Sequence, residues 1–158
     1  MKAKPWHTYA FWILLSLGVG ALSGYLSADG MTAFEESVQQ PPLSPPSLVF
    51  PFVWTILYAL MGISAGRIRL SKPSADSRRG MNLFIAQLIV NFFWSPIFFR
   101  AEAYGFAFLW LLLLWSLVLA MILQFRKADP TASKLQIPYL LWLTFAAYLN
   151  LGIWHLNK

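Results

Sequence analysis

The chain of 158 residues contains 58% hydrophobic and 17% aromatic residues, with 12 basic side chains, 6 acidic side chains and no cysteine. This composition excludes an ordinary water-soluble domain, and the lack of cysteine excludes disulfides and thiolate metal sites. The net charge of +6 does not indicate a nucleic-acid partner, because the basic residues lie in short connections between apolar segments and form no aromatic-interleaved basic face.

Five intervals without acidic or basic residues are each long enough to cross a bilayer as a helix. We therefore expect an all-α integral membrane protein, a bundle of five transmembrane helices in one domain over residues 1–158. The expected helices are residues 6–27, 45–69, 80–99, 103–126 and 130–156. The longest connection, residues 28–44, is the predicted lid.

Basic residues are distributed unevenly over the predicted connections. Five crossings place ten of them on the side of the N-terminus and two on the other side, so the positive-inside rule predicts a cytoplasmic N-terminus in a bacterial cell membrane. The ten are Lys2, Lys4, Arg67, Arg69, Lys72, Arg78, Arg79, Arg126, Lys127 and Lys134, and the two are Arg100 and Lys158. The predicted lid then faces outward.

Small residues in the first expected helix have the spacing Gly20-x-x-x-Gly24. Glycines four residues apart let a second helix approach the backbone closely in membranes. We expect this face to pack against another helix, within one chain or between two copies of it.

Five prolines surround the expected start of the second helix, in the stretch PPLSPPSLVFP at residues 41–51. Ser44 or Ser47 is the expected N-cap, and the paired prolines before it favour a stiff, extended approach. Pro51 falls inside the expected helix, where it should leave the Ser47 carbonyl unpaired and bend the axis toward protein or a wet cavity. The alternative is a loop that the prolines merely keep rigid.

The remaining helices contain two further signals. The run LWLLLLWSLVLAMIL in the fourth helix indicates a lipid-facing or packing surface. Asp129 and Pro130 form an N-cap and first-turn pair for the fifth helix, which we expect to continue through Pro138.

No acidic or basic side chain lies within the apolar interior of any expected crossing, apart from histidines near the ends. Ion pathways, proton relays and metal-assisted hydrolysis normally need such groups. We therefore expect no catalytic residues, no metal ligands and no cofactor, and a protein that is not an enzyme.

Three expected helices each present a stripe that combines aromatic rings with neutral hydrogen-bonding groups. Each stripe is consistent with an ordinary packing face in which Gln87, Asn91 and Asn150 bond across helices. Beside a proline-rich lid, the three together indicate a pocket for a flat, mostly apolar ligand. The candidate ligand-binding residues are Phe50, Trp54, Tyr58, Gln87, Asn91, Trp94, Tyr139, Trp142, Ala146 and Leu149.

The segments PPLSPPSLVFPFVWTILYALMG at 41–62, QLIVNFFWSPIFF at 87–99 and PYLLWLTFAAYLNLGIWHLN at 138–157 resemble the translocator protein family, also called tryptophan-rich sensory proteins or peripheral-type benzodiazepine receptors. The resemblance covers nearly the whole chain. It implies a five-helix bundle, often dimeric, that binds porphyrins and isoquinoline carboxamides in a pocket closed by the first loop.

The sequence departs from the family pattern at several positions. Leu43 and Leu48 replace tryptophans near the paired prolines, Glu102 replaces a basic residue, and no basic residue follows Tyr148 closely enough for the sterol-binding consensus. Aromatic contacts from the lid and tight sterol binding are therefore not expected.

The resemblance favours a membrane receptor or carrier for porphyrins and haem intermediates that affects tetrapyrrole transport, turnover or stress signalling. Light-dependent oxidative breakdown of bound porphyrin is one alternative. A scaffold for partner membrane proteins, with no saturable small-ligand site, is another.

Overall fold

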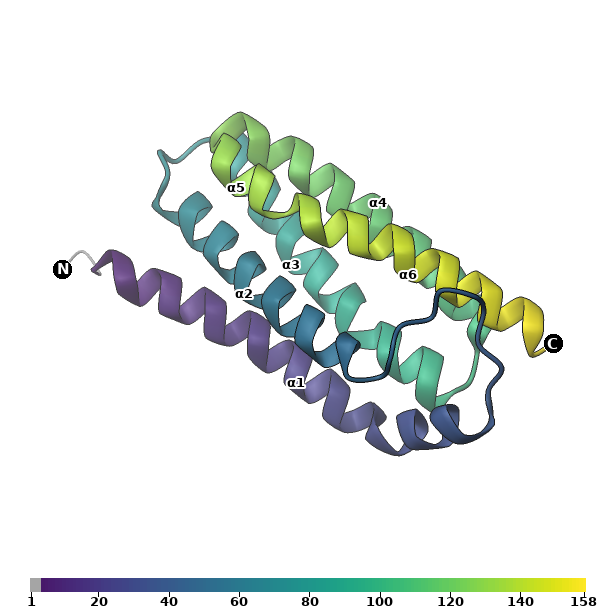
Figure 1. Ribbon diagram of the computed structural model, residues 1–158. Coiled ribbons are helices and arrows are strands. Elements are labelled where there is room, and N and C mark those ends of the chain that lie inside the picture. The colour runs from purple at the N-terminus through teal and green to yellow at the C-terminus, as the bar shows by residue number, and fades with distance from the viewer. Residues whose placement is uncertain (1–3) are drawn as a thin grey trace.

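The structure, a computed structural model, describes residues 4–158 and is an up-and-down bundle of long helices (Figure 1). Its elements are α1 (Pro5–Ser37), α2 (Val49–Leu70), α3 (Ala75–Ser95), the short π-helix η1 (Pro96–Arg100), α4 (Tyr104–Ala128), α5 (Pro130–Leu135) and α6 (Ile137–Leu156). Five helical segments are long and apolar enough to span a membrane, with α3 and η1 forming one and α5 and α6 another. The predicted five-helix, all-α membrane bundle is confirmed.

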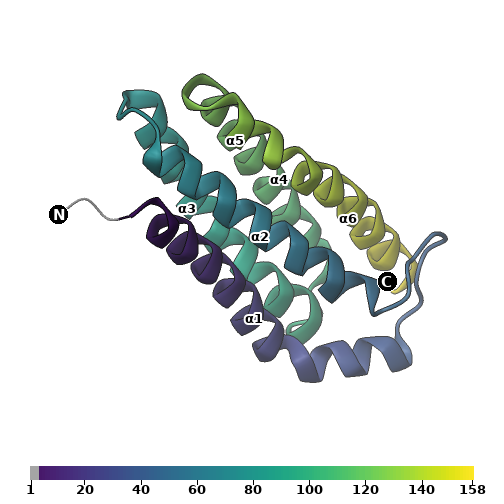
Figure 2. The ribbon, with the colours of Figure 1, turned by 60° about the vertical axis from the view of Figure 1, so that its left-hand side comes forward.

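The bundle has two ends, which we name the base and the mouth. The base contains the start of α1, the α2–α3 connection and the α4–α5 junction. The mouth contains the end of α6, the η1–α4 connection and the lid loop, residues 38–48. Figures 1 and 2 show the two ends separated by the length of the helices.

The core lies between α2, α3, α4 and α6, where large apolar side chains interlock. Six of them have no exposed surface: Met61, Phe84, Val118, Met121, Phe125 and Leu143. Because lipid offers an equally apolar solvent, the stability of such a bundle depends on close packing and on hydrogen bonds between helices.

The helices α1 and α2 approach each other closely at Gly62, where a Cβ atom would collide with the backbone of Ile13. Within one chain, the predicted Gly20-x-x-x-Gly24 contact is found only at Gly20, and packing of this face between two copies stays a prediction. Gly20 lies against the ring of Tyr58, but a Cβ atom at Gly24 would meet nothing within 4 Å. Within one chain, close packing of α2 on α1 is thus found at Gly62 and Gly20.

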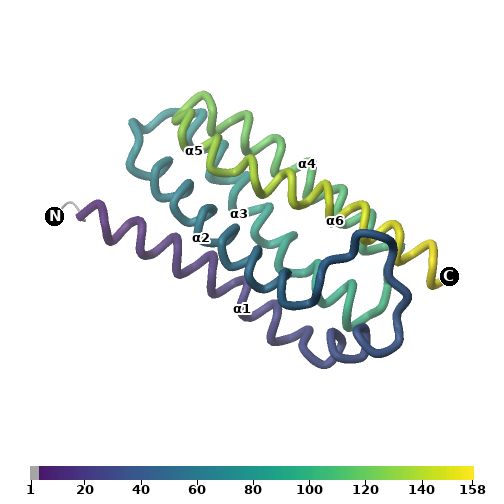
Figure 3. The backbone as a smooth tube through the Cα atoms, viewed as in Figure 1, coloured from purple at the N-terminus to yellow at the C-terminus, as the bar shows by residue number. Residues whose placement is uncertain are grey.

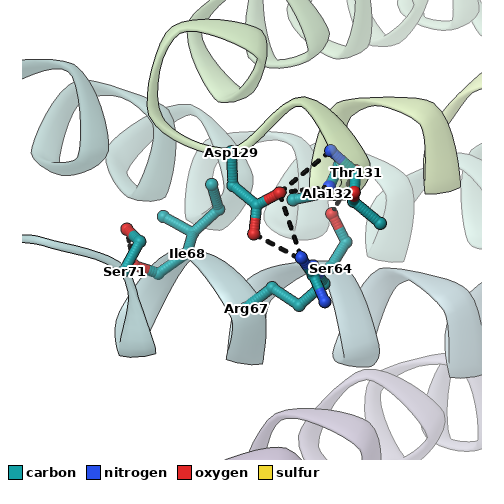
Figure 4. Close-up of polar contacts among 7 residues, drawn as sticks. All are labelled: Ser64, Arg67, Ile68, Ser71, Asp129, Thr131 and Ala132. Carbon is teal, nitrogen blue, oxygen red and sulfur yellow. Dashed lines mark hydrogen bonds and ion pairs between the residues drawn. The ribbon is translucent and has the colours of Figure 1, made fainter.

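At the base, α2 is joined to the α4–α5 junction by Arg67 and Asp129 (Figure 4). The Arg67 Nε lies 2.9 Å from Asp129 Oδ2. Asp129 Oδ1 also accepts hydrogen bonds from the backbone N–H groups of Thr131 and Ala132, as the predicted N-cap requires. Ser64 adds a hydrogen bond of 2.7 Å to the Ala132 carbonyl.

The electrostatics of Asp129 follow from this contact. Burial raises the pKa of its carboxyl, but the hydrogen bond and positive charge of Arg67, with the two backbone N–H groups, lower it by more. The net pKa lies below its ordinary value of 3.8, so the ionised form is the one that the base stabilises.

The predicted lid, residues 28–44, is wrong at its start, because α1 continues to Ser37. The last turns of α1 lie at the mouth end of the bundle (Figure 3) and pack on η1: the Phe34 ring lies 5.5 Å from that of Phe98 and 5.3 Å from that of Phe99. The acidic residues Asp29, Glu35 and Glu36, which follow the first charge-free interval, lie on α1, and Phe34 beside them is covered by η1. The true loop is residues 38–48.

The predicted start of α2 is also wrong. The helix begins at Val49 after an N-cap at Leu48, which places Pro51 in the first turn. The Ser47 carbonyl is not unpaired, because it accepts a hydrogen bond of 3.4 Å from the Phe50 N–H. A proline in a first turn removes no hydrogen bond within the helix, so the kink argument does not apply.

Two further boundaries differ from the prediction. The third helix begins at Ala75 and not at Gly80, because Ser74 and Ser77 form a reciprocal capping box. The fifth crossing is not continuous: α5 ends at Leu135, Gln136 breaks the helix, and Pro138 falls in the first turn of α6. Pro51, Pro96 and Pro138, which lie inside predicted crossings, thus each fall in the first turn of a helical element in the structure.

Candidate binding cavity

A cavity of about 700 Å³ opens at the mouth, between α1, α2, α3, η1, α4, α6 and the lid loop. This volume is in the range of sites for drug-sized ligands. Its lining is dominated by aromatic and aliphatic side chains.

Eight of the ten candidate residues line this cavity: Phe50, Trp54, Tyr58, Asn91, Trp94, Trp142, Ala146 and Leu149. They come from α2, α3 and α6, so the fold brings the three stripes to one place. Gln87 and Tyr139 do not line it. Both are fully buried below it.

A chain of side-chain hydrogen bonds forms the cavity floor. Tyr58 donates its hydroxyl to Asn91 Oδ1, and Asn91 Nδ2 donates to the Tyr139 hydroxyl at 2.6 Å. Tyr139 donates to Gln87 Oε1 at 2.8 Å, and Gln87 Nε2 contacts the Met61 sulfur at 3.9 Å. The polar groups of three helices thus satisfy one another, which buried groups in a membrane require.

Aromatic rings form two walls above this floor. On one wall, the Trp54 ring lies 5.5 Å from Tyr58 and 6.1 Å from Tyr139, and the Phe50 ring lies 5.9 Å from Trp142. These rings bridge α2 and α6.

On the opposite wall, Trp94 stacks on Phe98 at 4.9 Å. The Trp94 indole Nε1 donates to Asn150 Oδ1 at 3.3 Å, and Asn150 in turn donates to the Tyr104 carbonyl at 2.9 Å. This indole is therefore held by a hydrogen bond as well as by packing.

The sequence analysis missed the contributions of α1 and α4. From α1, Gly20, Ala21, Ser23 and Gly24 line the cavity, and from α4, Leu111 and Leu114 do so. The small residues create the hollow, because Gly24 carries no side chain into it and Gly20 leaves room for Tyr58. The Gly20 and Gly24 spacing is the sequence feature that indicates this contribution of α1, although the same spacing also predicts helix packing.

The lid loop is attached to α6. Tyr148 donates its hydroxyl to the Pro42 carbonyl at 2.8 Å, and Asn157 pairs with both backbone groups of Gln39, at 3.0 Å and 2.8 Å. Pro41 packs at Gly152, where a Cβ atom would collide with its ring. Leu43 has a φ of 70° and is 81% exposed, so it makes no wall of the cavity.

Charge is nearly absent from the cavity. Glu35, from the last turn of α1, is the one charged side chain among its lining residues, and it lies at the mouth with Gln40, Ser44 and Ser47. The interior is neutral, so the cavity suits a ligand whose buried part is apolar and uncharged.

A sequence profile described as the TspO/MBR family matches residues 12–155 of the chain, which include all three cavity-forming stripes. The chain belongs to the TspO/MBR family.

Individual relatives agree with this assignment. The chain is 34% identical to the translocator protein of Ovis aries, over 99% of this chain and 94% of that protein. It is 32% identical to the tryptophan-rich protein TspO of Chlorobaculum tepidum, over 95% and 96% of the two chains. It is 36% identical to protein CrtK of Rhodobacter capsulatus, over 79% of each.

Proposed function

We propose that this protein is a membrane receptor or carrier that binds porphyrins and related flat hydrophobic ligands in the cavity at the mouth. Membership of a family of translocator and tryptophan-rich sensory proteins supports a membrane receptor role. The observation that most strongly supports porphyrin binding is a cavity of about 700 Å³ whose lining includes tryptophans from three different helices, Trp54, Trp94 and Trp142.

The polar chemistry of the cavity supports a neutral ligand core. The floor hydroxyls and amides are already paired with one another, so the ligand gains little from them and is held by aromatic contact. Aromatic contacts of this kind contribute about 0.5–1.5 kcal/mol each beyond the area that they bury. A porphyrin ring is flat and can therefore lie against the aromatic side chains of the cavity. Its propionates can remain at the polar mouth.

The test is a titration with protoporphyrin in detergent, followed by quenching of tryptophan fluorescence. Trp142→Phe should weaken binding about tenfold, since a decade of affinity corresponds to about 1.4 kcal/mol. Ala146→Leu should weaken binding by filling space one turn from Trp142.

The matched control is Trp115→Phe. Trp115 lies outside the cavity and donates its indole N–H to Thr144 at 2.9 Å. Each variant is first shown to be folded by its thermal midpoint. Equal affinities for wild type, Trp142→Phe and Ala146→Leu would refute the proposal and leave the stripes as packing faces.

Light-dependent breakdown of bound porphyrin remains the second candidate. The observation that favours it is the position of Trp54, a cavity wall whose ring lies beside those of Tyr58 and Tyr139, both oxidisable phenols. Loss of porphyrin absorbance in the light but not in the dark, dependent on the protein and on Trp54, would support it. Equal loss without the protein would exclude it.

A further inference from the structure

A second hollow, of about 420 Å³, lies outside the cavity and between α2 and α6. We name it the outer groove. It lies within the membrane-spanning parts of both helices, so the solvent that it meets is the hydrocarbon of the bilayer. Its lining residues are Val53, Ile56, Leu57 and Leu60 from α2, with Pro138, Leu141, Trp142 and Phe145 from α6.

The groove exists because α2 and α6 diverge. The backbone of α2 packs closely on α1 and, at the base, on α5, whereas α2 and α6 have almost no close backbone approach. Side chains alone fill the space between these two helices toward the mouth, with Phe50 contacting Trp142 across it. A boundary made only of side chains can open without any change in the helices.

Of residues 4–158, Trp142 alone lines both the cavity and the outer groove. Its indole Nε1 is buried and has no hydrogen-bond partner among the described residues. By contrast, the indoles of Trp94, Trp110 and Trp115 each donate a hydrogen bond. Rotation of Trp142 therefore costs packing contacts but breaks no hydrogen bond.

We propose that a lipid acyl chain occupies the outer groove and that Trp142 closes a lateral portal, through which apolar ligands pass between the bilayer core and the cavity. This proposal rests on the proposed function in one respect only, the identity of the ligand that passes through the portal. Flat apolar molecules partition into the bilayer first, and this route keeps them in hydrocarbon surroundings. The route past the mouth runs beside the lid loop, which is held by hydrogen bonds to Tyr148 and Asn157.

The first experiment bridges each route with the same bifunctional maleimide, which the absence of native cysteine permits. Ile56→Cys with Leu141→Cys spans the outer groove, and both positions are exposed, at 46% and 65%. Gln39→Cys with Asn157→Cys fastens the lid loop to α6 at a site outside the cavity lining. Bridging is verified by mass, and protoporphyrin association is followed by stopped-flow fluorescence in lipid nanodiscs.

The groove bridge should slow association at least about tenfold, whereas the lid bridge should change it less than about twofold. Slowing by the lid bridge that equals or exceeds slowing by the groove bridge would overturn the portal, as would unchanged association in both. If unbridged protein binds no protoporphyrin, the proposed function fails, and the second experiment then decides on the groove.

The second experiment needs no porphyrin. Protein in phosphatidylcholine vesicles that contain a lipid with a mid-chain diazirine is irradiated, and adducts are mapped by peptide mass spectrometry. Ile56, in the groove, is compared with Leu113, on the lipid face of α4, because the two are 46% and 45% exposed and lie at similar distances from the base. A seated acyl chain predicts several-fold more adducts at Ile56, whereas equal labelling would overturn the acyl-chain site.

Discussion

The two ends of α2 differ in what holds them. In the half of α2 toward the base, the helix is joined to its neighbours by backbone approach at Gly62, by the Arg67–Asp129 ion pair and by the Ser64 hydrogen bond. At the mouth, α2 faces α6 across aromatic side chains and a cavity. The base end of α2 is thus held by an ion pair and a hydrogen bond, whereas its mouth end meets α6 through the rings of Phe50 and Trp142.

This difference separates stability from binding within one helix. Close packing and satisfied polar contacts hold the bundle together, whereas a cavity lowers stability because its lining lacks contacts on one side. The hydrogen-bonded floor of Tyr58, Asn91 and Tyr139 marks the boundary between these two regions. Substitutions below it should change folding, and substitutions above it should change affinity.

The largest expected effect concerns which compartment each end faces. Ser37→Cys lies at the mouth and Lys72→Cys at the base, both at exposed positions. An impermeant maleimide should label Ser37→Cys in intact cells and label Lys72→Cys only after the membrane is opened, because the basic residues gather at the base. Labelling of both in intact cells would contradict the topology, and the cysteine-free parent chain is the control.

Gly62→Ala tests the closure of the base. The new methyl group would collide with the backbone of Ile13, which cannot move aside as a flexible side chain can. Overpacking of this kind costs about 1–3 kcal/mol, so the thermal midpoint in detergent should fall.

Gly24→Ala is the matched control, since its methyl group meets no neighbour. Alanine is favoured over glycine in a helix by about 0.5–1 kcal/mol, so its thermal midpoint should stay the same or rise. A fall in midpoint as large as that of Gly62→Ala would show that the two positions are packed alike.

Asp129→Ala should destabilise by about 0.5–2 kcal/mol, because it removes the N-cap of α5 and also leaves Arg67 without its partner. Asp129→Asn keeps the N-cap of α5 and should therefore lose less stability than Asp129→Ala. Because folding lowers the pKa of Asp129, its carboxylate contributes stability above its ordinary value of 3.8, and the contribution is lost as the pH falls through the lower pKa of the folded state. A midpoint difference between wild type and Asp129→Asn that persists below this range would contradict the assignment.

The membrane class, the five spans and the stripes were predictable from the sequence, because each follows from apolar length or from helical spacing. The helix boundaries were less predictable. Pro51 and Pro138 lie inside apolar runs that continue without interruption, so hydropathy alone does not locate the restarts that the structure shows at Val49 and Ile137. The general preference of proline for first turns was the available signal.

The site was predictable on three helices and not on the others. Trp54, Asn91 and Trp142 each belong to a stripe on a different helix, and the spacing of each stripe can be recognised in a single sequence. The contribution of Leu111 and Leu114 depends on how α4 is rotated in the bundle, and leucines that face a cavity have no local feature that separates them from leucines that face lipid. In the extension of α1 to Ser37, Phe34 packs against Phe98. The two residues are distant in sequence, so local sequence patterns do not predict this contact.

We infer that the mouth binds the ligand while the base holds the fold together. The decisive measurement compares the protoporphyrin dissociation constants of Trp54→Phe and Asp129→Ala, both measured on folded protein in the same detergent. We expect about tenfold weaker binding for Trp54→Phe, with its thermal midpoint little changed, and binding within about twofold of wild type for Asp129→Ala, with its midpoint lowered. Equal affinities for the two variants, or a greater loss for Asp129→Ala, would contradict it.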